Sequence, residues 1–362
     1  MKKLLLVTAV IALLCLGSIA QAITIDMVTV GDAGNLADTR YNLEPKYDHT
    51  AGYGAVAYDY KIGTYEVTAG QYTEFLNAVA KTDRYALYNM EMWNSTASQG
   101  IQRTGSDGSW TYSVTDAFTN RPISKVSWGD AARFTNWLHN GQTTGAQDGS
   151  TTEDGAYFLN GATTDAQLLL VLTHEADARY WIPTEDEWYK AAYYDPNKAG
   201  GAGYWYYPTS SNMTPGTDIT DASSNNANYM GGSGTTEVGE FQNSKSAYGT
   251  FDQGGNVWEW DQDIFDEVTY DEAGDNIILR VPNNRGLRGG SYQDSLIGID
   301  VGTEWEKWVN PLSAEWRNAN VPTFERYNVG FRVASVVPEP MSIMLGIMGL
   351  GSVAGFKRLR RK

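Results

Sequence analysis

Two carboxylates and two glycines stand close together in the segment 252–260. Asp252 and Glu259 offer oxygen ligands, and Gly254 and Gly255 let the backbone turn tightly enough for carbonyl oxygens to converge. Ca²⁺ takes about six to eight oxygens from such a mixture. The segment therefore predicts a calcium site. The alternative interpretation is a hydrogen-bonded turn that packs the two tryptophans of the segment into the core.

Sulfur and imidazole ligands are scarce in this chain. Its one cysteine is Cys15, and its three histidines, His49, His139 and His174, are far apart in the sequence. Soft ions such as Cu(I) prefer thiolates, and no two of the histidines have the short spacing of a helical or strand metal pair. We therefore expect no copper or iron; an iron site built from three distant histidines is the alternative. No Gly-x-Ser-x-Gly sequence indicates a serine hydrolase.

The first 22 residues have the three parts of a secretory signal peptide. Lys2 and Lys3 are followed by an apolar run and by the small-x-small sequence Ala20-Gln21-Ala22. We expect removal of residues 1–22, and with them Cys15. The mature chain would then begin near Ile23 and contain no thiol.

A second sorting pattern closes the chain. Val337-Pro338-Glu339-Pro340 precedes an apolar stretch over 341–356, and five basic residues follow it. Such an order predicts a short membrane helix with its charges on the cytoplasmic side. It resembles the PEP-CTERM signal (337–362) of Gram-negative bacteria, which implies export across the inner membrane and recognition by an exosortase. Proteins with this signal are often associated with the cell surface or with extracellular polysaccharide in a biofilm matrix.

The composition predicts a folded and strongly acidic protein. Hydrophobic residues make up 42% of the chain and aromatic residues 12%, which is too much for a disordered chain, while 38 glycines indicate many loops. The net charge of −16 becomes more negative once the two basic ends are removed. This charge disfavours nucleic acid and anionic lipid as partners, so we expect membrane contact only through the C-terminal tail.

Few regular elements are expected to position these residues. Three segments combine an N-cap signal with apolar residues at helical spacing, beginning at Thr68, Ser127 and Thr184. The second is expected to end at Gly141 and the third at Asp195-Pro196. Short strands are predicted at Tyr58–Ile62, Ile277–Val281 and Val329–Val333, and a surface loop at Gln142–Asp154.

Six motifs follow one another in a fixed order. They are Tyr60–Thr68 (YKIGTYEVT), Pro122–Trp128 (PISKVSW), Ile182–Trp188 (IPTEDEW), Gly255–Trp260 (GNVWEW), Arg288–Tyr292 (RGGSY) and Gly330–Arg332 (GFR). This series resembles the formylglycine-generating enzyme family, also called the sulfatase-modifying factor domain. The resemblance covers about 57–335, with 23–56 as an N-terminal segment. It implies an α+β fold of the C-type lectin-like type with little regular secondary structure.

The resemblance also implies which chemistry to look for. The family oxidises a substrate cysteine to formylglycine with two cysteines of its own that hold Cu(I). The first of these corresponds to Asp294 and the second lies near Ile299, so neither is present. Ser291 matches a serine of the family's active site, and its alternative role is a structural hydroxyl in a tight turn. We therefore expect no catalytic residues, with Ser291 and Asp294 as remnants.

The calcium expectation gains detail from the same resemblance. It assigns one ion to the side chains of Asp252 and Glu259 and to the carbonyls of Gly255 and Val257. A second family site would correspond to Asn228 and the carbonyl of Tyr229, although no aspartate partner follows downstream.

The preferred hypothesis is an exported, calcium-stabilised binding or structural module without the family's oxidase activity. Two alternatives stay open. One is an oxidoreductase that uses ligands other than cysteine. The other is a glycan-binding surface protein, for which the aromatic run Tyr204–Tyr207 could supply stacking rings.

Overall fold

The computed structural model describes residues 22–41, 52–94, 99–222, 224–270, 277–299 and 307–337. His49, residues 1–21 and residues 338–362 lie outside these ranges, and with them most of the predicted leader and tail. In the described part of the chain, no helix is both long enough and apolar enough to cross a bilayer.

Within the described ranges, helices are few and short. Their bounds are α2 (Ala69–Val79), α3 (Glu91–Asn94), α4 (Trp128–His139), α5 (Asp165–Leu168) and α6 (Glu185–Tyr193). The three predicted helices are confirmed as α2, α4 and α6. Each begins directly after the residue predicted to cap it, and each N-cap makes a reciprocal capping box with the third residue of its helix.

Two four-stranded sheets form the framework. The first has the order β1 (Met27–Val30), β2 (Tyr60–Gly63), β14 (Ala334–Val336) and β5 (Tyr180–Trp181). The second has the order β12 (Asn318–Asn320), β9 (Ile277–Arg288), β8 (Trp258–Tyr270) and β13 (Val329–Gly330). All neighbours pair antiparallel except β13 with β8, which is parallel.

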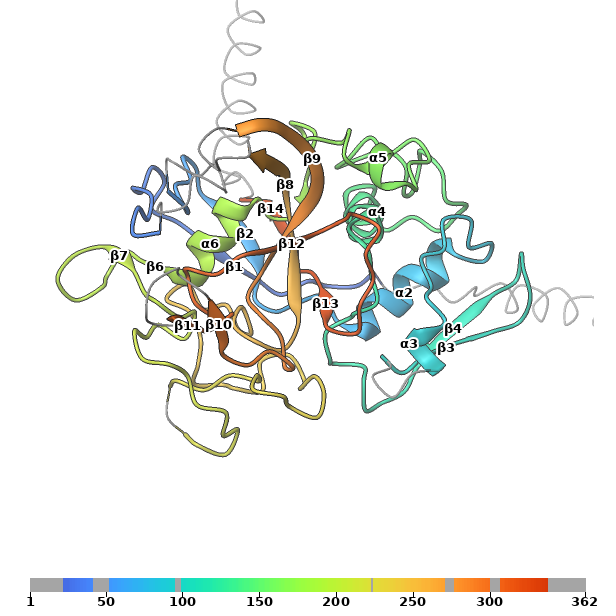
Figure 1. The fold of residues 1–362 in the computed structure, drawn as a ribbon. Coiled ribbons are helices and arrows are strands. Elements are labelled where there is room, and N and C mark those ends of the chain that lie inside the picture. The colour runs from blue at the N-terminus through green and yellow to red at the C-terminus, as the bar shows by residue number, and fades with distance from the viewer. Residues whose placement is uncertain are drawn as a thin grey trace, which may run out of the picture.

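Three two-stranded ribbons complete the described elements. They are β3 (Ile101–Thr104) with β4 (Thr111–Val114), β6 (Tyr194–Asp195) with β7 (Gly203–Tyr204), and β10 (Ile297–Ile299) with β11 (Lys307–Val309). Figure 1 shows β8 and β9 running together through the middle of the molecule, with α6 on one side and α2 and α4 on the other. The fold therefore has mixed sheets, low helix content and long connecting loops.

The predicted strands are present with changed lengths. The strand expected at Tyr58–Ile62 is β2, and Ile277–Val281 lies within β9. The strand expected over Val329–Val333 ends at Gly330. Beyond it, the carbonyls of Phe331 and Val333 accept single hydrogen bonds from the amides of Val67 and Gly63 and do not continue the β8 ladder. This change of partner lets the side chain of Arg332 turn into the core.

The interior combines aromatic rings with buried ion pairs. Trp128, Trp188 and Trp260 are fully buried. Three arginine–glutamate pairs lie among such residues: Arg133 with Glu153, Arg288 with Glu185 and Arg332 with Glu259. Buried charges persist only when they are paired, so these contacts specify how the helices, sheets and loops meet.

Candidate functional site

The predicted calcium segment is a tight loop that leads into β8. Asp252 and Asn256 both have φ of +58° and Gly255 has φ of +92°. A Cβ atom at Gly255 would lie 2.3 Å from the carbonyl oxygen of Asn228. Gly255 is therefore required both by its left-handed backbone and by the close approach of a neighbouring loop.

Glu259, the first residue of β8 after Trp258, is fully buried and is held from two sides. Its Oε2 accepts hydrogen bonds from Arg332 Nε (2.5 Å) and Trp188 Nε1 (2.7 Å), and its Oε1 accepts one from Arg332 Nη2 (2.6 Å). A carboxylate has about four acceptor positions, so these three bonds leave one of them on Oε1. Glu259 can therefore still supply one ligand bond to a cation.

Asp252 is also partly free. Its Oδ2 accepts a hydrogen bond from the backbone amide of Gly239 (2.6 Å), while Oδ1 accepts none within the described residues. Burial raises the pKa of Asp252 to about 6, the carboxylate of Glu259 contributes to the rise, and Arg332 opposes it. Asp252 also borders a small cavity of about 10 Å³, but Gly255, Val257 and Glu259 do not line it.

Two backbone carbonyls complete the predicted ligand set. In the described part of the chain, neither the Gly255 nor the Val257 carbonyl accepts a hydrogen bond from another backbone or side-chain group. Both residues are buried. Buried carbonyls nearly always have a partner, so these two oxygens are positions where an ion or ordered water is expected.

No three histidine, cysteine, aspartate or glutamate side chains converge on one point among the described residues. The predicted calcium site has only two such side chains, Asp252 and Glu259, together with two backbone carbonyls, so the absence of a trio does not bear on it. His139 accepts a hydrogen bond at Nδ1 from the amide of Arg179 (3.2 Å). His174 stacks on Trp181 and contacts Gln262 Oε1 at 2.7 Å. These two histidines thus have structural partners of their own.

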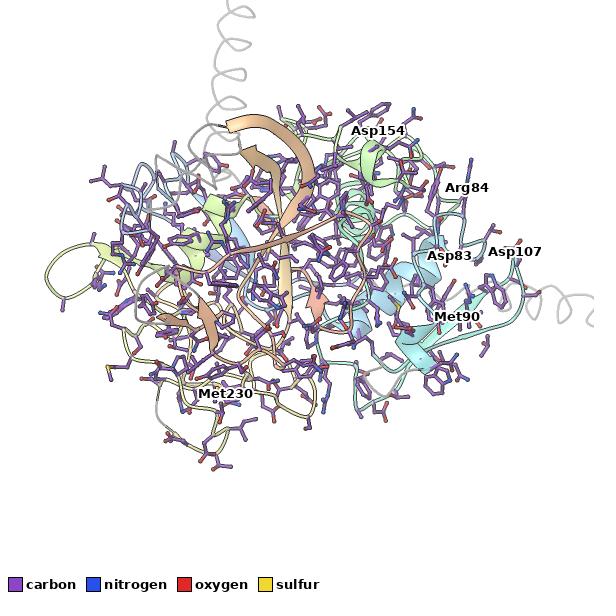
Figure 2. All side chains as sticks on the ribbon, in the orientation of Figure 1. Asp83, Arg84, Met90, Asp107, Asp154 and Met230 are labelled. Atoms are coloured by element: carbon purple, nitrogen blue, oxygen red, sulfur yellow. The ribbon has the colours of Figure 1, made fainter. Side chains whose placement is uncertain are left out.

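The residues of the second predicted calcium site lie against the first loop. The Asn228 carbonyl accepts a hydrogen bond from the amide of Asn256 (2.9 Å), and Asn228 Nδ2 donates to Gly234 O (3.0 Å). The Tyr229 hydroxyl donates to Pro215 O (2.6 Å). Figure 2 labels the next residue, Met230, on the loops below β10 and β11. Asn228 therefore braces the 252–257 loop.

Ser291 and Asp294 contact each other directly. Ser291 donates to Asp294 Oδ2 through both its hydroxyl (2.5 Å) and its amide (2.8 Å), and Asn328 Nδ2 donates to Ser291 Oγ (3.1 Å). Burial raises the pKa of Asp294, and the hydrogen bonds from Ser291 oppose that rise. This geometry is that of a carboxylate closing a tight turn, and Met230 N also donates to the Asp294 carbonyl (2.7 Å).

Two residues near the 252–257 loop were not singled out from the sequence. Glu66 is 2% exposed; its Oε1 accepts from Asn256 Nδ2 (3.1 Å), while Oε2 has no partner among the described residues. Burial raises the pKa of Glu66 well above its ordinary value, and Asp252 and Glu259 add to the rise. Arg332 is the second. Both residues lie inside quoted motifs, so their place in the sequence was visible and their burial was not.

The aromatic run considered for sugar stacking is largely internal. Tyr204 is 8% exposed and Tyr207 is 4% exposed. The Tyr204 hydroxyl lies within hydrogen-bond distance (2.9 Å) of the carbonyls of both Leu36 and Gly54. These two rings cannot form an open platform. Exposed aromatic rings occur elsewhere in the described structure, at Tyr58, Trp93 and Phe158.

Comparisons with known proteins identify the relatives. A family model of the sulfatase-modifying factor enzyme 1-like domain matches residues 24–337. Among solved structures, the chain is similar to the crystal structure of CarF (19% identity, 87% of this chain and 99% of that chain, TM-score 0.48). It is also similar to Treponema denticola variable protein 1 (19% identity, 88% and 97%, TM-score 0.46) and to PvdO from Pseudomonas aeruginosa (18% identity, 87% and 93%, TM-score 0.39).

No curated protein matches the chain. The family match begins at Thr24, three residues before β1, and ends at Val337, one residue after β14, so it includes both four-stranded sheets. The family predicted from the six motifs is confirmed, and the chain belongs to the family of sulfatase-modifying factor enzyme 1-like domains.

Proposed function

We propose that this protein is an exported, calcium-stabilised member of its family that acts as a binding or structural module and not as a cysteine-based oxidase. The fold would be the C-type lectin-like variant that the family resemblance implies. The observation that carries the proposal is the set of four unengaged oxygen positions in the 252–257 loop and at the start of β8: Asp252 Oδ1, the carbonyls of Gly255 and Val257, and one acceptor position of Glu259.

These positions fit a hard cation chemically. All four are oxygens, two belong to carboxylates, and two are buried carbonyls that lack a protein partner in the described structure. Burial raises the pKa of Asp252 to about 6, and the neighbouring carboxylate of Glu259 adds to the rise. A bound Ca²⁺ would place a positive charge beside these two carboxylates and would join the loop to the start of β8.

We favour a binding role because the mature chain would have no thiol with which to hold Cu(I). Cys15 is the only cysteine, and removal of residues 1–22 would take it away. Asp294, at the position expected for the first copper-binding cysteine, is engaged with Ser291. A hard carboxylate does not replace a thiolate as a ligand for Cu(I). An oxidase with other ligands is the competing function, and it predicts a tightly held transition metal.

The two terminal segments of the sequence suggest where the module would act. We propose export through the inner membrane, recognition of the 337–362 signal by an exosortase, and a final location at the cell surface or in the extracellular matrix. Extracellular polysaccharide or surface proteins are the partners that this location offers. The acidic surface disfavours nucleic acid.

Metal content and melting temperature test this proposal together. The mature chain, purified without chelator, is expected to contain stoichiometric calcium by elemental analysis. Removal of the ion with EGTA should lower the melting temperature of a domain of this size by roughly 3–5 °C, because saturating a site about 100-fold above its Kd stabilises the folded state by about 2.7 kcal/mol. Asp252→Asn should abolish most of this shift.

Asp107→Asn is the matched control, since Asp107 is an exposed carboxylate on the turn between β3 and β4. It should leave the EGTA effect unchanged. Copper or iron at one ion per chain, together with oxygen consumption in the presence of a thiol peptide, would instead establish the oxidase. If neither EGTA nor added calcium changed the melting temperature, the calcium part of the proposal would be wrong.

A further inference from the structure

A groove of about 560 Å³ lies beside the short helix α5, which Figure 1 shows at the outer edge of the molecule. Six apolar residues line it: Phe158, Leu159, Ala162, Leu170, Val171 and Leu172. Leu170 is 79% exposed, Leu172 is 67% exposed and Phe158 is 57% exposed. Single exposed apolar side chains are common on protein surfaces, whereas several at one groove indicate a surface that something covers.

The last described strand lies close to this groove. Ala334 of β14 pairs with Trp181 of β5. The indole of Trp181 stacks on the ring of His174, with 4.7 Å between the ring centroids. Both sequence neighbours of His174 line the groove. The chain beyond Val337, one residue after β14, therefore starts only a few side-chain contacts away from the rim of the groove.

The segment that follows has the length to enter the groove. Three residues, 338–340, connect Val337 to the apolar stretch 341–356. Three extended residues span about 10 Å, and a helix over 341–356 would be about 24 Å long. The apolar stretch can therefore lie along the groove without any change in the described fold.

The composition of this segment also suits the groove. Ile343, Ile347 and Leu350 have the i, i+4, i+7 spacing of one helix face, which would meet the apolar lining. Glu175 is the one charged residue of the described lining. Five basic residues close the segment, and the chain as a whole has a net charge of −16. The charges thus favour contact between this segment and the folded domain.

We propose that, while the C-terminal signal is still attached, the apolar stretch 341–356 folds back and occupies this groove. Docking there keeps the stretch out of water until the membrane or the exosortase takes it. Cleavage of the 337–362 signal then uncovers Phe158, Leu170 and Leu172 in the mature protein. This inference goes beyond the proposed function, because the docking does not require calcium at the 252–257 loop.

Disulfide trapping tests the docking directly, since the chain 23–362 contains no cysteine of its own. Leu172→Cys combined with Ile347→Cys, in protein purified without detergent, should form a disulfide on mild oxidation, measured by mass spectrometry of tryptic peptides. Leu36→Cys with Ile347→Cys is the matched control. Leu36 is 86% exposed, but it follows β1, which lies at the opposite edge of the sheet from β5.

The Leu172→Cys pair should yield about tenfold more disulfide than the Leu36→Cys pair, because docking raises the effective concentration of its two thiols. Its yield should not depend on the protein concentration. Equal yields from the two pairs would mean unspecific collapse of the tail and would overturn the proposal. A yield that rises with protein concentration would assign the groove to a second copy of the chain. Binding of the chain 23–337 to phosphatidylethanolamine vesicles, abolished by Leu172→Ser, would assign it to a bilayer. Either result would also overturn the proposal.

Discussion

Glu259 and Arg332 form a fully buried ion pair at the junction of β8 with the 252–257 loop. Both side chains are 0% exposed, and Arg332 also donates to the carbonyls of Gly63 (2.9 Å) and Phe251 (2.9 Å). One guanidinium thus connects β2, the loop and β8. Its position explains why the charge of Glu259 is tolerated without solvent.

Removing that guanidinium should be severely destabilising. We expect Arg332→Met to lower the free energy of unfolding by about 3–5 kcal/mol, because it leaves Glu259 charged, buried and unpaired. Urea denaturation followed by tryptophan fluorescence measures the change. The double variant Glu259→Gln with Arg332→Met should recover part of the loss. If the double variant were as unstable as the sum of the two single variants, the pair would not be coupled.

The sequence could single out together only those candidate residues that lie in one local motif. Asp252, Gly255, Val257 and Glu259 lie within eight positions of one another, three of them in the 252–257 loop and Glu259 at the start of β8. Arg332 and Glu66 could not be placed in this way, because their contacts with Glu259 and Asn256 span 73 and 190 positions. Such pairings depend on how sheets and loops meet, which local spacing does not record.

The helix α6 shows how a short element is held in a protein rich in loops. Thr184 Oγ1 accepts from the amide of Glu187 (3.1 Å), and Glu187 Oε2 accepts from the amide of Thr184 (2.8 Å) and from Trp181 Nε1 (2.9 Å). The cap therefore also ties the helix to β5. Trp188 on the same helix donates to Glu259, so the start of α6 helps to position the candidate site.

Thr184→Ala is expected to lower the stability of the protein by about 1 kcal/mol through loss of this cap. Thr164→Ala, at the equivalent position of the exposed four-residue helix α5, is the comparison and should cost less, because that helix buries only Leu168. Thermal melting of the two variants side by side measures both effects. A larger loss at Thr164 would contradict the role assigned to the α6 cap.

At the element scale, helices were easier to predict than sheets. Thr68, Ser127 and Thr184 each carry the complete capping signal within four residues, and each helix begins where the signal places it. The pairing of β14 between β2 and β5 has no comparable local signal, since it joins residues more than 150 positions apart. The sequence of β1 has no pattern that distinguishes it from an exposed extended segment. Its assignment as a strand depends on its pairing with β2.

Buried acids make the stability of the whole molecule depend on pH in an unusual direction. Burial raises the pKa of both Asp186 and Asp263 to about 6, and Glu185 adds to each rise. The folded state therefore binds protons more readily than the unfolded state, in which aspartate has a pKa near 3.9. Their stabilising contribution is complete below about pH 4 and is lost as the pH rises through about 6.

We therefore expect the melting temperature of the calcium-free protein to rise as the pH falls from 7 to 5. Melting curves at half-unit pH intervals in EGTA measure this slope, and Asp263→Asn should flatten it. Asp107→Asn should leave the slope unchanged. A calcium-free protein whose melting temperature falls steadily over the same interval would contradict the expectation.

The order of strands in the first sheet has a consequence for synthesis. β14 is the last described strand of the chain, yet it lies between β2, from the first quarter, and β5, from the middle. Until residues 334–336 have left the ribosome, β2 and β5 have no strand between them. Arg332, the counter-charge of Glu259, also emerges only at this late stage. The first sheet and the Glu259–Arg332 pair therefore cannot form until residues 332–336 have been made, and a premature stop before position 332 would yield an incompletely folded product that is open to proteolysis.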